Sequence, residues 1–168
     1  MNKYIFDTNV LVDSYSKYYR IQNFPTFWDK YLLYILDKSN DCCFIDKVYE
    51  EINHFGNKDL YDWVKSNNIP IVSTNNKIII DEYLNVFNKI KSINAYTDSS
   101  IANWDNDYVA DPWLIAVAIN KKYTIVTSEV PATANSQHKK LKIPDVAKEF
   151  DIECISMQRF ITMENFVI

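Results

Sequence analysis

Short apolar segments separated by amphipathic ones constrain the fold of this chain more than any other feature of its sequence. Four of them have the length and composition of buried β-strands, namely residues 3–6 (KYIF), 42–45 (CCFI), 123–129 (YTIVTSE) and 152–155 (IECI). The segments between them have helical periodicity. Because strands that alternate with helices form a parallel sheet with helices on both faces, the sequence predicts the α/β class.

Apolar residues at three- and four-residue spacing mark the predicted helices. Their ranges are residues 8–19, 25–38, 47–55, 57–67, 77–91, 111–122 and the segment KIPDVAKEF before the last strand. Asp46 and Asp111 are predicted to be the N-caps of the helices that follow them, with Pro112 in the first helical position. Residues 92–110 are polar and are predicted to be irregular. No linker or repeat divides the chain, so a single domain is expected over residues 1–168.

Composition excludes several classes of function. A single glycine, Gly56, excludes the Gly-rich loops of dinucleotide-binding and P-loop proteins. The net charge of −4 excludes a broadly basic surface for nucleic acid, although a local basic patch stays open. Cys42, Cys43 and Cys154 lack metal-binding spacing and are expected to be buried free thiols. No apolar stretch approaches the ~20 residues that span a bilayer, and no signal peptide is evident, so a cytoplasmic protein without membrane contact is expected.

Acidic residues occur where the predicted strands end, at the edge of the sheet that binds ligands in parallel α/β folds. Asp7 directly follows the first strand inside an apolar run, where a carboxylate loses hydration at considerable cost. Glu129 ends the third strand segment, and Asp111 opens the helix that leads to it. Glu51 lies at the edge of the apolar face of its helix, whereas Glu50 is expected to point to solvent.

Each acidic residue except Asp7 has a simple interpretation when it is taken alone. Asp111 fits an N-cap, and Glu51 and Glu129 fit solvated side chains. Taken together, however, four converging carboxylates would repel one another unless a cation neutralised them. Because oxygen ligands of this kind suit Mg²⁺ or Mn²⁺, we expect a divalent metal site formed by Asp7, Glu51, Asp111 and Glu129.

Several segments in a fixed order carry a family resemblance that covers nearly the whole chain. They are YIFDTNVLVD, FWDKYLLYI, DKVYEEI, DLYDWVKSN, ADPWLIAVA, YTIVTSE and KIPDVAKEF. In these segments the chain resembles the PIN-domain nucleases, and among them a PIN-like bacterial and archaeal family related to toxin–antitoxin toxins. The resemblance implies a three-layer α/β/α sandwich around a mainly parallel, five-stranded sheet.

The resemblance also implies metal-dependent cleavage of RNA phosphodiester bonds. Asp7, Glu51 and Asp111 match the family's acidic metal ligands. The fourth acidic position is usually an aspartate, whereas this chain has Glu129. The metal would supply a hydroxide for in-line attack on phosphorus, and the resemblance leaves open whether one or two ions take part.

Polar neighbours of these acids have supporting roles in the resemblance. Asn9, together with Thr8, is expected to order the Asp7 carboxylate. Thr127 or Ser128 is expected to hydrogen-bond a water molecule at the metal. The catalytic set that follows is Asp7, Glu51, Asp111, Glu129, Asn9 and Thr127.

Three cationic segments are candidates for RNA contacts: SKYYR (16–20), NKK (120–122) and HKKLK (138–142), with Tyr18 or Tyr19 stacking on bases. The same residues also fit helix ends and amphipathic faces. Small PIN proteins are often toxins, so an antitoxin protein and a second copy of the chain are expected partners besides RNA. The alternative is a catalytically inactive PIN-like binding module that acts through protein or RNA contacts. A DNA nuclease of the flap-endonuclease type is disfavoured by the length of the chain.

Overall fold

The apolar segments form one parallel sheet of five strands. A computed structural model describes residues 3–37, 42–55, 57–132 and 140–165. The strands are β1 (Tyr4–Phe6), β2 (Cys42–Ile45), β3 (Ile71–Val72), β4 (Thr124–Val126) and β5 (Cys154–Ile155). Their order across the sheet is β3-β2-β1-β4-β5, which makes β1 the central strand.

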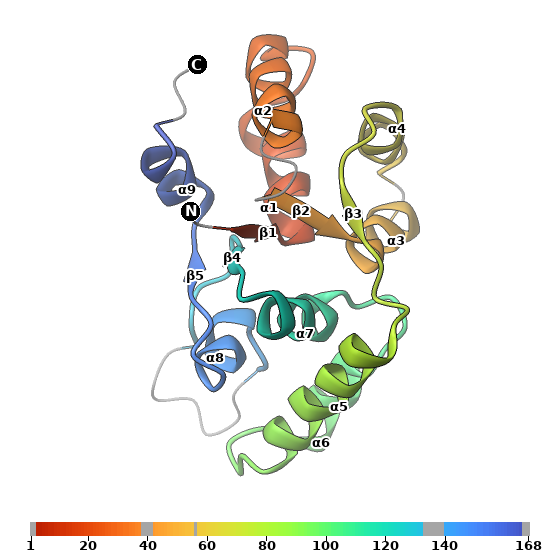
Figure 1. Ribbon diagram of the computed structural model, residues 1–168, viewed down its shortest axis with the longest axis vertical. Coiled ribbons are helices and arrows are strands. Elements are labelled where there is room, and N and C mark those ends of the chain that lie inside the picture. Colours follow the sequence, from red (N-terminus) through yellow and green to blue (C-terminus); the bar gives the residue numbers. More distant parts are fainter. Residues whose placement is uncertain (1–2, 38–41, 56, 133–139, 166–168) are drawn as a thin grey trace.

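Helices cover both faces of this sheet. They are α1 (Thr8–Asp13), the π-helix η1 (Ser14–Tyr18), α2 (Pro25–Asp37), α3 (Asp46–His54), α4 (Lys58–Ser66), α5 (Lys77–Lys91), α6 (Asp98–Trp104), α7 (Asp111–Lys121), α8 (Ile143–Lys148) and α9 (Met157–Met163). Figure 1 shows α2, α4 and α9 on one side of the sheet and α5, α6, α7 and α8 on the other. The predicted α/β class and three-layer α/β/α sandwich are therefore confirmed.

The core is built around β1 and α7. Every residue of β1 is buried, and Phe6 packs edge-to-face on Tyr31 of α2 and Phe160 of α9. Aromatic pairs of this kind add about 0.5–1.5 kcal/mol each beyond the burial of their surface. On the other side of the sheet, residues 114–118 of α7 are buried on all sides of the helix. Neither α7 nor any other helix in the described ranges combines the length and apolar character that a membrane span requires.

Four elements differ from the sequence prediction. Residues 92–110 are not irregular throughout, because α6 forms there with Thr97 as its N-cap. The two-residue strand β3 and the helix α9 were missed. β3 is too short for an apolar pattern and lies at the edge of the sheet, where Ile71 is exposed. The first predicted helix (8–19) changes to a π-helix at Ser14.

The prediction that two aspartates are N-caps was wrong. Ile45 and Ala110 occupy the N-cap positions of α3 and α7, so Asp46 and Asp111 are the first residues of these helices. Asp46 instead accepts backbone hydrogen bonds from Lys47 and Thr74, both at 2.9 Å. It thereby ties the end of β2 to the segment after β3, because its short side chain reaches both backbones.

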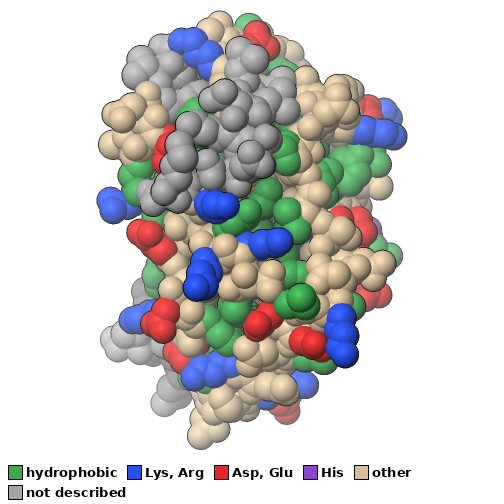
Figure 2. Space-filling view, in the orientation of Figure 1, with side chains coloured by type: hydrophobic (Ala, Val, Ile, Leu, Met, Phe, Trp, Pro, Cys, Tyr) green, Lys and Arg blue, Asp and Glu red, His purple; other side chains and the backbone are tan. Residues whose placement is uncertain are grey.

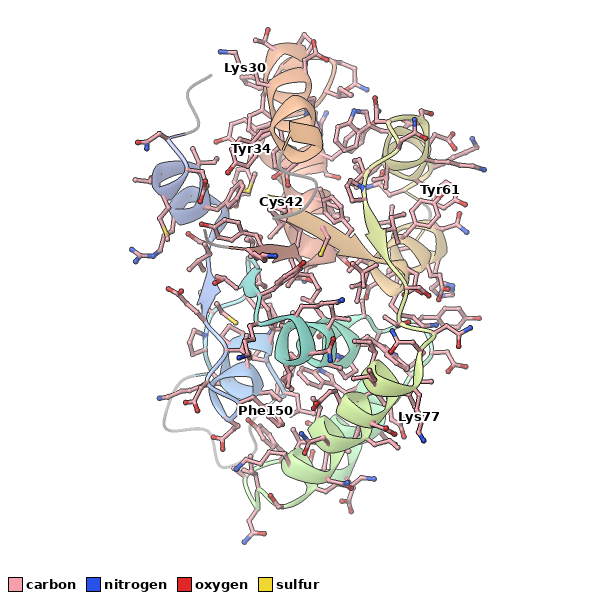
Figure 3. The ribbon with its side chains drawn as sticks, in the orientation of Figure 1. Lys30, Tyr34, Cys42, Tyr61, Lys77 and Phe150 are labelled. Atoms are coloured by element: carbon pink, nitrogen blue, oxygen red, sulfur yellow. The ribbon has the colours of Figure 1, made fainter. Side chains whose placement is uncertain are left out.

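The opposite end of the sheet, where β1 and β2 begin, is held by Glu164. Its carboxylate accepts hydrogen bonds from the hydroxyl groups of Tyr4 (2.5 Å) and Tyr34 (2.6 Å). Figure 3 shows Tyr34 on α2 above Cys42 at the start of β2. Cys42 and Cys43 are buried, Cys154 is partly buried, and all three are free thiols, as predicted. These bonds join β1, α2 and the end of α9 at the end of the sheet opposite Asp7.

Candidate active site

Asp7 lies at the carboxyl end of the central strand, and its side chain is only 1% exposed. Its backbone N–H donates to the Val126 carbonyl of β4 at 2.9 Å, which continues the sheet by one residue. Its Oδ2 accepts a hydrogen bond from Thr127 Oγ1 at 2.8 Å, and the nearby backbone N–H of Asn9 lowers the pKa of the same carboxyl group. Burial raises the pKa of Asp7 to about 7, opposed by the Thr127 bond and assisted by the charge of Glu129. Without a cation beside it, Asp7 therefore keeps its proton to a higher pH than an exposed aspartate does.

Asp111 begins α7 close to Asp7. Burial raises its pKa well above the ordinary value, and the negative charges of Asp7 and Glu129 raise it further. Within the described parts of the chain, no group donates a hydrogen bond to its carboxylate. The positive charge of Lys142 lowers the pKa of Asp111. A desolvated carboxylate without a donor, next to several like charges, is an arrangement that a bound cation stabilises.

Glu51 approaches this pair from α3. Its Oε2 accepts a hydrogen bond from the Thr8 hydroxyl group, and the backbone N–H of Ala110 donates to the same carboxylate. Burial raises its pKa, and these two donors oppose that change. Glu51 is thus held between the turn after β1 and the start of α7. Glu50 is exposed, as predicted.

Glu129 is already neutralised by a residue of this chain. Its Oε1 accepts a hydrogen bond from the Lys142 ammonium group at 2.6 Å, and its Oε2 accepts one from the Ile143 backbone N–H at 2.7 Å. The bond to Glu129 raises the pKa of Lys142, and the charges of Asp111 and Asp7 contribute to the same change. In the sequence Lys142 is part of the candidate RNA-binding segment 138–142, and no local pattern indicates its pairing with Glu129.

The four predicted carboxylates are therefore brought together, but they are not arranged as a preformed metal site. Each of Glu51, Asp7 and Glu129 raises the pKa of Asp111, so the four lie within electrostatic range of one another. Across the described ranges, no three His, Cys, Asp or Glu side chains are placed so that together they could hold a metal ion. Two of the four have other partners: Glu129 accepts hydrogen bonds from Lys142 and Ile143, and Glu51 accepts one from Thr8.

The supporting residues act differently from the expectation. Asn9 contacts Asp7 through its backbone N–H, while its side chain is exposed. The Thr8 hydroxyl group bonds Glu51 and not Asp7. Thr127 is buried, and its hydroxyl group donates to Asp7 while it accepts from the Glu129 backbone N–H at 3.0 Å. Thr127 is therefore a positioning residue for Asp7.

The three candidate RNA-binding segments lie in different places. Residues 16–20 include most of η1, which directly continues α1. Lys121 and Lys122 lie at the far end of α7, roughly 15 Å along the helix from Asp111. Of residues 138–142, His138 and Lys139 lie outside the described residues. On the face that Figure 2 shows, basic and acidic side chains are interspersed, as the net charge suggests.

The chain matches a known protein family over nearly its whole length. A family model matches residues 4–168, and its description is Domain of unknown function (DUF4411). No curated protein matches the chain. The matched range includes Asp7, Glu51, Asp111 and Glu129.

Proposed function

The chain belongs to the DUF4411 family, and we propose that this member is a metal-dependent ribonuclease of the PIN type that hydrolyses RNA phosphodiester bonds. The observation that carries the proposal is the pair of desolvated carboxyl groups, Asp7 and Asp111, beyond the central strand. Burial raises the pKa of both, and the negative charge of Asp7 raises the pKa of Asp111 further. A divalent cation would stabilise the charged form of both groups.

The donor set fits one Mg²⁺ or Mn²⁺ ion better than two. Asp7, Asp111 and Glu51 supply carboxylate oxygens, which are the preferred ligands of both ions. Glu129 has an ammonium group on one oxygen and a backbone N–H on the other. We therefore propose the first three residues as the metal ligands and leave Glu129 as the partner of Lys142. Their side chains would have to move together on binding, because no three such groups in the described ranges are placed to hold a metal as they stand.

A bound ion would supply a water of lowered pKa for attack on phosphorus. The chain's own groups prepare the site for it. The Thr127 hydroxyl group fixes the Asp7 carboxylate by a hydrogen bond, and both this bond and the nearby Asn9 backbone N–H favour its charged form. Thr8 and Ala110 do the same for Glu51. Lys142 supplies a positive charge within electrostatic range of Asp7, where the negative charge of a phosphodiester group must be accommodated.

Calorimetric titration with MnCl₂, combined with a cleavage assay on labelled single-stranded RNA, tests this function. We expect about one Mn²⁺ bound per chain, and cleavage that requires Mn²⁺ or Mg²⁺ and stops with EDTA. A purified chain that binds no divalent ion and leaves RNA intact would refute the proposal.

The Lys142–Glu129 pair favours a second candidate, the inactive PIN-like binding module. A protein ammonium group in an acidic pocket can replace a metal ion as the neutralising charge. In that case the chain would bind RNA or a protein partner and would not hydrolyse RNA at any Mn²⁺ concentration. The same titration and assay separate the two candidates.

The resemblance to toxins extends the proposal to a toxin of a toxin–antitoxin pair, with an antitoxin protein and a second copy of the chain as partners. We expect induced expression of the wild-type chain to arrest growth, and co-expression of a small protein encoded by a neighbouring gene to restore it. Expression of Asp7→Asn should leave growth unaffected. Growth arrest by both forms would show that toxicity does not depend on the acidic site.

A further inference from the structure

A cavity of about 280 Å³ opens beside the acidic edge, between the start of the chain's first helices and α9. Its walls come from α1 and η1, from the segment after β4, and from the beginning of α9. The lining residues used below are Val10, Tyr18, Ser128, Met157, Gln158 and Ile161.

The cavity shares its backbone with the acidic site. Val10 lies on α1, which begins directly after Asp7. Ser128 lies between Thr127, which donates to Asp7, and Glu129, which bonds Lys142. A group bound in this cavity therefore lies against the same two turns that hold the proposed metal ligands.

The lining combines apolar walls with neutral polar groups and one carboxylate, that of Asp13. Val10 and Met157 are buried, and Ile161 is partly buried. Ser128 and Gln158 are exposed at the cavity and offer a hydroxyl group and an amide group. Apolar walls with a few placed polar groups are typical of sites for small planar ligands.

Tyr18 supplies an aromatic ring at this cavity. It is 60% exposed, and its ring packs on no other aromatic ring of the described chain, whereas the neighbouring Tyr19 is stacked on Phe27 at 4.3 Å. The acidic member of the lining, Asp13, is paired with Lys17 at 2.6 Å, so its charge is offset at the surface. Nucleobases of single-stranded RNA bind to proteins by stacking on such rings and by hydrogen bonds from their edges.

Another cavity, lined by Lys47, Glu50, His54, Asp107 and Tyr108, is less suited to RNA. It contains two carboxylates, and Tyr108 is already stacked on His54 at 3.7 Å. This comparison favours the cavity at Tyr18.

We propose that the cavity between η1 and α9 binds one nucleobase of single-stranded RNA, stacked on Tyr18 and contacted by Gln158, next to the bond that the acidic site cleaves. This inference rests on the proposed function. It predicts that Tyr18 contributes to RNA affinity even when no metal is present.

Fluorescence anisotropy with labelled octauridylate, octaadenylate and octacytidylate in EDTA tests the subsite, because hydrolysis is then stopped. Tyr18→Ala should raise the Kd about 5- to 100-fold, the range of one lost base–aromatic stack. The matched control is Tyr108→Ala, which removes a similarly exposed tyrosine (52%) from the other cavity and should change the Kd less than about twofold. Gln158 is exposed, and Gln158→Ala should change the preference among the three oligonucleotides. This second variant tests the subsite even if Tyr18→Ala fails to fold.

Equal effects of Tyr18→Ala and Tyr108→Ala, or no binding by the wild type, would overturn the subsite. Failure of the subsite and failure of the proposed function are distinguishable. Metal-dependent cleavage with unchanged Kd and KM in Tyr18→Ala rejects the subsite alone. Tyr18-dependent RNA binding without cleavage in Mn²⁺ rejects the nuclease alone.

Discussion

Asp7→Asn should lower the rate of metal-dependent RNA cleavage at least about 100-fold, while the chain stays folded. Asparagine keeps the shape of the side chain and can still accept the hydrogen bond from Thr127, but it removes the negative charge that would bind the cation. Loss of groups that only support metal ligands typically costs 10- to 100-fold, and loss of a ligand should cost at least as much. Initial rates on labelled RNA in Mn²⁺, with circular dichroism of both proteins, measure the effect.

The matched control is Glu50→Gln, because Glu50 lies on α3 beside Glu51 but is exposed and paired with Lys47. This variant should cleave RNA at the wild-type rate. Undiminished cleavage by Asp7→Asn, in a preparation free of contaminating nuclease, would reject the assignment of the active site.

Asp7→Asn should also change how stability depends on pH. The pKa of Asp7 is about 7 in the folded chain and near 3.8 when the group is exposed. Between these values the folded state binds more protons than the unfolded state, so the free energy of unfolding falls as the pH rises from about 4 to 7. In EDTA at pH 8, Asp7→Asn should therefore be more stable than the wild type, and the difference should vanish near pH 4.

Urea unfolding at several pH values measures this difference. Addition of Mn²⁺ at pH 8 should stabilise the wild type, because a ligand that binds only the folded state shifts the equilibrium towards it. The same addition should have little effect on Asp7→Asn. Identical stability of the two proteins from pH 4 to 8 would mean that Asp7 carries no electrostatic cost.

Lys142→Met should raise the affinity for Mn²⁺ at least about tenfold. Its ammonium group lies within electrostatic range of Asp7 and Asp111, where it opposes the binding of another cation. Two unit charges 4 Å apart interact by about 4 kcal/mol at an effective dielectric constant of 20, and a tenfold change in affinity needs only about 1.4 kcal/mol. Methionine keeps most of the length of the side chain and removes the charge. In EDTA, the same variant should unfold at a lower temperature, because the carboxylates lose this neutralising charge.

Lys140→Met is the control, since Lys140 is an exposed lysine two residues away. Titration calorimetry on the three proteins compares affinity and stoichiometry. One ion per wild-type chain and a second ion in Lys142→Met would identify Glu129 as a latent ligand. Equal Mn²⁺ affinity in all three proteins, or weaker binding by Lys142→Met, would show that the Lys142 charge does not oppose metal binding.

Local patterns in the sequence were sufficient for most elements of the fold. The buried strands β1 and β2 and the long helices α2, α5 and α7 follow the predicted ranges within one or two residues, because each buries a continuous apolar run or face. The elements that the sequence prediction missed are short. α6 and α9 have seven residues each, and their main local signals are the N-cap residues Thr97 and Ser156. β3 has two residues and exists only because it pairs with β2.

The candidate site was also predictable in part from local patterns. The strand-end rule located Asp7, Asp111 and Glu129 at one edge of the sheet, and the helical wheel placed Glu51 at the edge of the apolar face of the helix after β2. The sequence by itself determined which carboxylates meet, because a parallel sheet aligns the ends of its strands. Only the tertiary structure decided what neutralises them. Lys142 reaches Glu129 across 13 residues, and Thr8 reaches Glu51 across 43. Contacts between separate elements depend on packing distances of a few ångströms, and no periodicity along the chain encodes them.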